Sequence, residues 1–362
     1  MSTFAVTRER LKTLLPIPKA DRVELAQLEG MDFQFVVQKG VYAPGQEVLY
    51  IPLDSLVPTD LAERLGLTGK LGGPEKNRVR TVQLRGVYSQ GVVAPIELAE
   101  GLTNPAQITQ HLGICKWEPD PNITQDAILF PRPDGQGRYD IEAADRHPEI
   151  VELLLDVPVM VTEKLEGENF WVRGDHATGR IDVGMRDNIV QPKPGARLNR
   201  YLRAAEQGGF HKFVRHLVRE YGQDVVVYGE LVGPGGSVPD IYKHTIERVV
   251  VFDIRVGHVF LPPTSTLEWV NWADRNLGGF YHVPVLSQPH DTLRRWLTTF
   301  DPKTNALRMI TVKEAADGMT HLCNLRVRRE GIVIRPLEPQ TILGFGRLIL
   351  KQHSAAYLAD SP

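Results

Sequence analysis

The sequence predicts an α+β fold in two domains, a small β-barrel followed by a larger domain of antiparallel sheets with flanking helices. Three observations lead to this prediction. The chain has 362 residues, which is long for one domain. Short apolar runs separated by glycine and proline fill the first part, to about Pro95. After Val157, nearly continuous apolar runs alternate with segments of helical periodicity.

The N-terminal part consists of short strands and turns. The predicted strands are residues 5–7, 22–28, 33–37, 47–52 and 80–85. Gly40, Pro44-Gly45 and Gly72-Gly73-Pro74 interrupt them, as turn residues do. Several short strands at this spacing are typical of a small barrel, and we predict an OB-like domain over residues 1–103.

A Pro/Gly-rich stretch, residues 104–138, is predicted to be irregular, and residues 104–150 are assigned as a linker or arm. A short helix is expected over residues 145–155. The second domain is predicted to span residues 151–362.

The second domain is predicted to open with a hairpin, strands 157–163 and 170–173, whose turn carries Lys164 to Glu168. A strand follows at residues 180–186. Apolar residues at i, i+3, i+4 and i+7 predict helices near residues 198–205 and 210–221. The apolar runs 224–232 and 248–256 are expected to be central strands.

Composition limits the classes of function. The net charge of −2 gives no bulk attraction to nucleic acid. Between Lys193 and Arg219, however, seven Lys/Arg face a single acid, Glu206, which suits local phosphate binding or a solvated helix face equally well. Two distant cysteines favour neither a zinc site nor a disulfide framework. With no signal-peptide core and no membrane-length apolar run, we expect a cytoplasmic, monomeric enzyme.

The chemistry rests on an ordered series of short motifs rather than on any one of them. The series is Lys164-Leu-Glu-Gly-Glu-Asn169, Val183-Gly-Met-Arg186, Tyr228-Gly-Glu230, Phe252-Asp-Ile254, Glu330-Gly-Ile-Val333 and Leu350-Lys351. A lysine after an apolar strand, followed by carboxylates, an aromatic residue and a second lysine, suits covalent nucleotidyl transfer. A lysine of pKa ~10.4 must lose its proton to attack a phosphate, and burial or nearby cations help it do so.

Each motif has an expected task. Glu230 and Glu330 lie beside glycines, at strand ends by the pattern, and could hold a ribose hydroxyl or hydrated Mg²⁺. Phe252 and Val333 could sandwich a purine ring, although core packing is the commoner role of any such residue on its own. Lys351 could bind the α-phosphate as a point charge.

Taken together, these segments resemble the nucleotidyltransferase motifs of polynucleotide ligases. In addition, an asparagine five residues after the lysine, here Asn169, is a feature of RNA ligases similar to bacteriophage T4 RNA ligase 2. The layout is most similar to the Deinococcus-type ATP-dependent RNA ligases, which carry an OB domain before the ligase domain. Two positions depart from the family pattern: Glu166 replaces a frequent aspartate, and Ile349 replaces a frequent lysine.

The resemblance implies an ATP-grasp-like nucleotidyltransferase domain and an ATP-dependent ligase that seals 3′-OH and 5′-phosphate ends. The implied substrate is RNA or a nicked duplex whose 3′-OH strand is RNA. The implied catalytic residues are Lys164, Lys351 and Arg186. The implied cofactor-binding residues are Glu163, Lys164, Asn169, Arg186, Glu230, Phe252, Val333 and Lys351, with Glu330 and Glu230 for Mg²⁺ or Mn²⁺. The sequence ends eleven residues after Lys351, so we expect no C-terminal OB domain of the kind found in DNA ligases and capping enzymes.

Two alternatives stay open at this point. One is a guanylyltransferase that uses GTP. The other is a non-catalytic RNA-binding protein, because residues 78–91 resemble a stretch of tRNA-binding OB modules. The basic residues of that region, Lys76, Arg78, Arg80 and Arg85, could also orient pyrophosphate during enzyme adenylylation.

Overall fold

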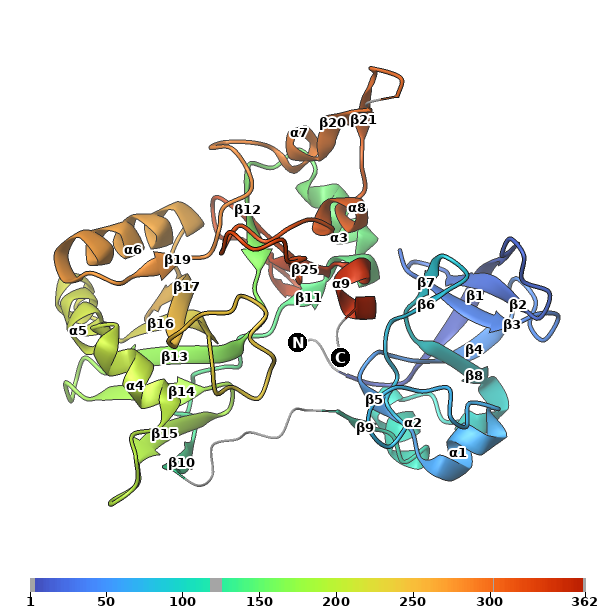
Figure 1. Cartoon of the computed structure of the whole chain (residues 1–362), viewed down its shortest axis with the longest axis horizontal. Coiled ribbons are helices and arrows are strands. Elements are labelled where there is room, and N and C mark those ends of the chain that lie inside the picture. Colours follow the sequence, from blue (N-terminus) through green and yellow to red (C-terminus); the bar gives the residue numbers. More distant parts are fainter. Residues whose placement is uncertain (1–3, 118–125, 302, 361–362) are drawn as a thin grey trace. The chain divides into compact units, whose positions relative to one another are not determined.

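The structure is a computed structural model that describes residues 4–117, 126–301 and 303–360 (Figure 1). The described chain forms two compact units. Unit one comprises residues up to 117 together with 142–152 and 352–360. Unit two comprises residues 126–141 and 153–351. Helices and strands are mixed in both units, so the predicted α+β class is confirmed.

Unit one is built on a five-stranded sheet in the order β3-β2-β1-β4-β8. Its strands are β1 (Thr7–Pro16), β2 (Val23–Leu28), β3 (Gln34–Gln38), β4 (Glu47–Ile51) and β8 (Val92–Pro95). All of their pairings are antiparallel. The first half of β1 pairs with β4 and the second half with β2, with a bulge between Leu11 and Thr13. A long bulged strand shared in this way curls the sheet, as the predicted OB-like domain requires.

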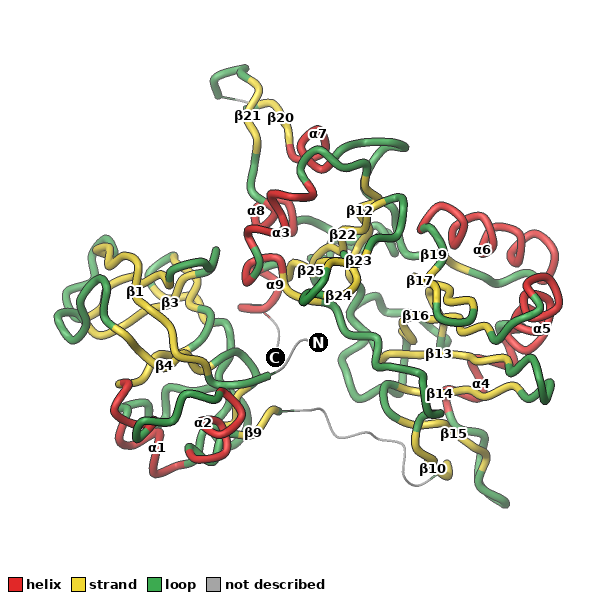
Figure 2. Tube along the Cα trace, turned by 180° about the vertical axis from the view of Figure 1, so that it is seen from behind, coloured by secondary structure: helices red, strands yellow, loops and turns green. Residues whose placement is uncertain are grey.

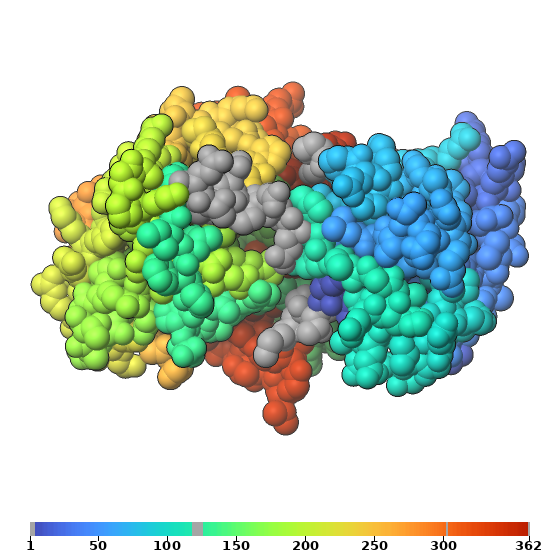
Figure 3. Space-filling model, turned by 90° about the horizontal axis from the view of Figure 1, so that it is seen from below, coloured from blue at the N-terminus to red at the C-terminus, as the bar shows by residue number. Residues whose placement is uncertain are grey.

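Strand β4 of this sheet is buried on both sides. Alternate residues of β4 enter different apolar clusters, with Val48 and Tyr50 in one and Leu49 and Ile51 in the other. This follows from the two-residue period of a strand, and it explains why β4 is a continuous apolar run. Figure 3 shows the N-terminal piece of unit one, residues 4–117, as blue to teal atoms.

Smaller elements complete unit one. They are β5 (Ser55–Leu56), α1 (Thr59–Arg64), β6 (Val82–Leu84), β7 (Val87–Ser89), η1 (Ile96–Ala99), α2 (Pro105–His111), β9 (Cys115–Lys116), β11 (Glu142–Ala143), η2 (Ala144–Arg146) and α9 (Ala355–Asp360), while α3 (Pro148–Leu154) runs from unit one into unit two. The strand predicted over residues 80–85 is reduced to β6, which pairs only with β7. Helix α2 forms where irregular structure was predicted, because Asn104 caps it and Pro105 occupies its first turn.

Unit two contains an eight-stranded sheet in the order β10-β15-β14-β13-β16-β17-β18, with β19 also paired to β17. Its strands are β10 (Ala127–Pro131), β13 (Glu168–Gly174), β14 (Ile181–Met185), β15 (Asn188–Pro192), β16 (Val225–Val232), β17 (Arg248–Val256), β18 (Val259–Phe260) and β19 (Tyr281–His282). Helices α4 (Arg200–Gln207), α5 (Phe210–Tyr221) and α6 (Pro263–Leu277) cover one face (Figures 1 and 2). The helices predicted near residues 198–205 and 210–221 are confirmed.

A second sheet contains β12 (Val159–Lys164), β22 (Gly331–Pro336) and β25 (Leu350–His353), with β22 between the other two. The predicted hairpin around Lys164 is wrong. β12 pairs with β22, whereas β13 pairs with β14 and β16 in the large sheet. Residues 165–167 therefore cross from one sheet to the other, because β12 pairs with the distant β22 while β13 pairs within the large sheet.

The remaining elements of unit two are short. They are α7 (Leu293–Leu297), β20 (Thr298–Phe300), β21 (Leu307–Met309), α8 (Val312–Ala316), β23 (Thr341–Ile342) and β24 (Gly346–Arg347). Figure 2 shows the β20–β21 hairpin projecting beyond α7. Among the described residues, no helix has the length and apolar character needed to cross a membrane.

Candidate active site

Lys164 is the last residue of β12, and strand register decides what lies beside it. In the antiparallel pairing of β12 with β22, Lys164 is opposite Gly331. Glu330 immediately precedes Gly331, so its carboxylate reaches the amine. Lys164 Nζ donates to Glu330 Oε1 at 2.5 Å. The structure therefore brings together two predicted site residues that are 166 positions apart in the sequence.

Carboxylates dominate the electrostatics around Lys164. Burial lowers the pKa of Lys164, but Glu330 and Glu230 offset that effect and the net pKa lies above the usual value. Burial raises the pKa of Glu230 to about 8, with Glu330, Glu166 and Glu168 adding to the rise while Lys164 opposes it. An excess of carboxylates around one amine fits a divalent cation, which needs only one or two carboxylates when phosphates supply the other ligands. In the part of the chain that is described, no cluster of three or more metal-ligating side chains forms a cage.

Asn169 and Glu230 lie side by side on adjacent strands of the large sheet. They are direct partners in the β13–β16 register. Gly167, just before β13, permits this approach, because a Cβ there would lie 2.7 Å from Glu230 Cγ and 2.9 Å from the Leu231 carbonyl oxygen. Glu230 thus lies within β16, whereas the apolar pattern predicted it at the end of the strand.

A tyrosine that sequence reasoning missed supports the crossing segment. The Tyr242 hydroxyl accepts a hydrogen bond from the Glu166 backbone N–H at 2.9 Å. The Tyr242 ring is buried with Leu165 in one apolar cluster, against which Phe252 also packs. A tyrosine in a loop far along the sequence gives no local signal of this contact.

Arg200 and Glu168 make a second contact that the sequence did not reveal. Arg200 donates to Glu168 Oε2, and Glu168 Oε1 accepts from the backbone and hydroxyl of Ser237 at 2.5 Å. Arg200 also donates to the Gly233 carbonyl at 3.4 Å. One arginine of the basic stretch 193–219 is therefore buried and neutralised, and it holds the loop that follows β16.

Phe252 occupies an irregularity in β17. Tyr228 is opposite Asp253 and Gly229 is opposite Val251, so Phe252 has no direct partner on β16. A bulge of this kind turns a side chain out of the regular pleat, and bulges are frequent next to active sites. Arg335 Nη1 donates to the Phe252 carbonyl at 2.5 Å and so satisfies it.

Register also sorts the other predicted residues of the small sheet. Val333 is opposite Thr162, two positions before Lys164, so Val333 and Lys164 share a face. Glu163 is on the other face, where its carboxylate accepts from the His321 N–H at 2.8 Å. Burial raises the pKa of Glu163. Lys351 lies on β25, the neighbour of β22.

Arg186 follows β14 in the turn to β15. Its Nη2 forms an ion pair with Asp140 Oδ1 at 3.0 Å. Its carbonyl accepts from Arg132 Nη1 at 2.9 Å. Two residues of the predicted linker thus bind this predicted catalytic arginine, Asp140 at its guanidinium and Arg132 at its carbonyl.

The basic residues of unit one are less available than the sequence suggested. Arg78 forms an ion pair with Asp54 at 2.7 Å, and its guanidinium stacks 3.4 Å from the centroid of Trp117. The Arg80 side chain packs against Gly72. Lys76 and Arg85 lie at turns with positive φ.

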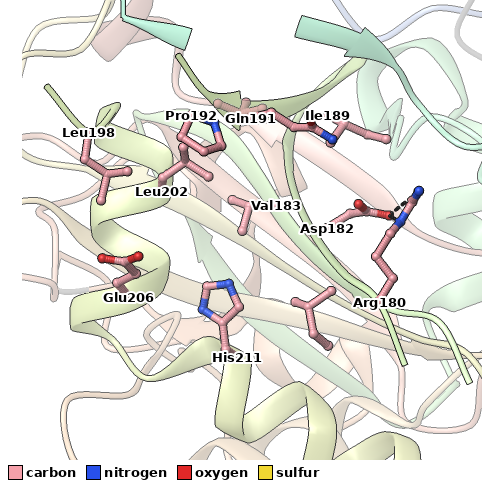
Figure 4. A pocket seen from close by; sticks show the side chains of 12 residues that line it. Arg180, Asp182, Val183, Ile189, Gln191, Pro192, Leu198, Leu202, Glu206 and His211 are labelled. Atoms are coloured by element: carbon pink, nitrogen blue, oxygen red, sulfur yellow. Dashed lines mark hydrogen bonds and ion pairs between the residues drawn. The ribbon is translucent and has the colours of Figure 1, made fainter. Parts of the chain in front are cut away.

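A pocket of about 330 Å³ lies on unit two between β14, β15, α4 and α5 (Figure 4). Its walls include Val183, Leu198 and Leu202, and its arginine, Arg180, is paired with Asp182 at 2.8 Å. The twelve lining residues contain none of the predicted site residues. An aliphatic wall with a neutralised arginine does not suit a triphosphate.

The combination of a strand-end lysine, facing carboxylates and a bulged aromatic residue agrees with comparisons to known proteins. The RNA ligase family model matches residues 157–353. The chain belongs to the RNA ligase family. An OB-fold domain model matches residues 5–96, which confirms the predicted N-terminal fold. A comparison with curated proteins finds no match.

Solved structures share the fold over nearly the whole chain. A variant of Naegleria gruberi RNA ligase with AMP and Mn is 24% identical with a TM-score of 0.76, and the match covers 98% of each chain. Another variant, with ATP and Mn, is 25% identical with a TM-score of 0.76 and the same coverage. The same ligase with PPi is 24% identical with a TM-score of 0.76, again over 98% of each chain. These likenesses show that the present chain shares the fold of the Naegleria ligase over nearly its whole length.

Proposed function

We propose that this RNA ligase uses ATP to join a 3′-OH end to a 5′-phosphate end, with Lys164 as its nucleophile. The observation that carries the proposal is the position of the Lys164 amine, at a strand end against Glu330 and near Glu230. The Naegleria ligase structures with ATP, AMP, PPi and Mn support the choice of nucleotide.

The proposed reaction has three steps, each with a defined bond exchange. Lys164 Nζ forms a bond to the ATP α-phosphorus, and pyrophosphate leaves. An oxygen of the RNA 5′-phosphate then attacks the same phosphorus, which releases the amine and leaves a 5′-adenylylated end. The 3′-hydroxyl finally attacks the 5′-phosphate, and AMP leaves. Only the free amine can attack. Glu330 favours the protonated amine, because its carboxylate raises the pKa of Lys164, and the amine would lose its proton more easily once the charge of Glu330 was neutralised.

The chain's own residues would divide the remaining work. Glu330 and Glu230 would hold Mg²⁺ or Mn²⁺, which would neutralise phosphate charge when bound. Phe252 and Val333 would contact the adenine, and Asn169 the nucleotide beside Glu230. Arg186 and Lys351 would contact the phosphates as fixed cations. Glu163, on the opposite face of β12, would act on the loop at His321.

Adduct formation tests the nucleophile and separates ATP from GTP. The protein is incubated with α-labelled ATP or GTP and Mn²⁺, and the labelled residue is identified by mass spectrometry. We expect AMP on Lys164 and no label on Lys164→Ala. Lys70→Ala is the matched control, because Lys70-Leu-Gly-Gly73 repeats the spacing of lysine and glycine in unit one. A GMP adduct would support the guanylyltransferase alternative, and no adduct would support the RNA-binding one.

The preferred end structure is a separate question. We propose a nicked duplex with RNA on the 3′-OH side as the substrate, acted on by a monomer. Sealing is compared on nicks with an RNA or a DNA 3′-OH strand and on single-stranded RNA. Faster sealing of single strands would contradict the nick proposal.

A further inference from the structure

Tyr139 and Asp140 lie in a stretch that neither family model covers. The OB-fold match ends at residue 96, and the RNA ligase match begins at residue 157. Residues 127–138 of this stretch are held on the large sheet. β10 pairs with β15 over five residues. Arg138 makes a bidentate ion pair with Asp187, with Nε–Oδ1 at 2.6 Å and Nη2–Oδ2 at 2.9 Å.

The ring of Tyr139 packs against Phe252. The two ring centroids are 4.9 Å apart, and Tyr139 also contacts Tyr228 and Phe260 at centroid distances of 5.0 and 5.7 Å. Aromatic pairs at such distances contribute beyond the area they bury. Phe252 is a bulge residue without a direct partner on β16. The contact with Tyr139 therefore supports a side chain that the pairing of β16 with β17 leaves unsupported.

The hydroxyl of Tyr139 is tied to the residue after Phe252. It donates to Asp253 Oδ2 at 2.6 Å. Asp253 is fully buried, accepts from Arg347 Nη1 at 2.6 Å, and lies 3.6 Å from Arg335 Nη1. Burial and the neighbouring Asp253 raise the pKa of Tyr139, so the hydroxyl keeps its proton and remains a donor. Tyr139 thus touches Phe252 through its ring and, through its hydroxyl, holds the side chain of the next residue, Asp253.

The next residue acts on a different part of the site. Asp140 Oδ1 is 3.0 Å from Arg186 Nη2. The side chain of Arg186 is partly exposed, so water competes for the pair and weakens it. It still restricts where a flexible arginine points.

We propose that Tyr139 and Asp140 are positioning residues of the nucleotide site, with Tyr139 setting the Phe252 ring and Asp140 aiming Arg186. This inference rests on the proposed contacts of Phe252 with adenine and of Arg186 with phosphate. It assigns to the segment between the two family-matched regions a part in ATP use.

The test is steady-state lysine adenylylation, measured as kcat and KM for ATP, alongside sealing of a pre-adenylylated nick that needs no ATP. We expect Tyr139→Phe to raise KM for ATP about 10-fold, the effect of about 1.4 kcal/mol, with sealing nearly unchanged. Tyr221→Phe is the matched control, because its hydroxyl accepts from Trp269 at 2.8 Å in the same unit. Asp140→Asn should impair adenylylation by up to about 5-fold.

Double variants decide whether the effects pass through Phe252 and Arg186. In a Phe252→Ala background, Tyr139→Phe should add little to KM, and in an Arg186→Ala background, Asp140→Asn should add little. Unchanged KM in folded Tyr139→Phe, or fully additive effects in the double variants, would overturn the inference. If the wild type forms no AMP adduct, the proposed function fails first and the inference with it. If the wild type forms the adduct and the Tyr139 and Asp140 variants behave like it, the inference alone is refuted.

Discussion

Asp253→Asn tests the buried ionic cluster behind Phe252. The carboxylate has no solvent exposure and accepts 2.6 Å hydrogen bonds from Tyr139 and Arg347. Asparagine keeps the shape and one acceptor oxygen but removes the charge. Arg335, with a side chain only 3% exposed, then has no countercharge there. Removing one partner of a buried ion pair costs about 3–5 kcal/mol, and we expect a loss of about 3 kcal/mol in the unfolding free energy of unit two.

Urea unfolding followed by tryptophan fluorescence measures this loss. Four of the five tryptophans, all except Trp117, are in unit two, so the signal reports mainly on that unit. With a slope of about 2–3 kcal/mol/M, a loss of about 3 kcal/mol lowers the midpoint by about 1–1.5 M. Asp156→Asn is the control, because it removes a carboxylate that pairs with Arg294 but is 77% exposed. Exposed pairs contribute about 0–1 kcal/mol.

The outcome that would refute the reasoning is a midpoint shift of similar size in Asp253→Asn and Asp156→Asn. Burial would then not determine the value of these pairs. An unchanged midpoint in Asp253→Asn would mean that water or a rearranged side chain replaces the carboxylate without cost.

Three further predictions follow from single contacts. Gly167→Ala should slow lysine adenylylation at least about 10-fold, because its methyl would lie 2.7 Å from Glu230 Cγ, whereas Gly137→Ala, in open space, should not. Burial lowers the pKa of His282 to about 4, so between about pH 6.5 and 4 only the unfolded chain takes up its proton. Stability in urea should therefore fall as the pH drops through that window, and His282→Gln should flatten the slope. Thr311→Ala removes the capping box of α8 and should cost about 1 kcal/mol in thermal unfolding.

Local patterns predicted the elements better than their partners. The runs that became β16 and β17 and the periodicity of α4 and α5 are recognisable because period and apolar content depend on nearby residues. The hairpin predicted around Lys164 failed because strand pairing depends on contacts far along the chain. β12 finds β22, which no local pattern can indicate.

The site residues, too, were predicted where the signal is local and missed where it depends on distant contacts. Lys164, Glu230 and Glu330 were predicted from short motifs, and the structure places them together. Tyr139 and Tyr242 were missed because each contacts the site from a loop that lies far from the motifs in the sequence. The pairing of Arg78 with Asp54 was missed for the same reason, since charge counted along a sequence does not show which carboxylate folds back on it.

The division of the chain between the units limits how either can be made alone. Unit one takes three separate pieces of sequence, and the last of them begins at residue 352, directly after Lys351. Unit two takes the two pieces between them. No single cut in the chain therefore yields one unit whole and free of the other. A fragment that stops at Lys351 keeps all the predicted motifs but lacks the last piece of unit one.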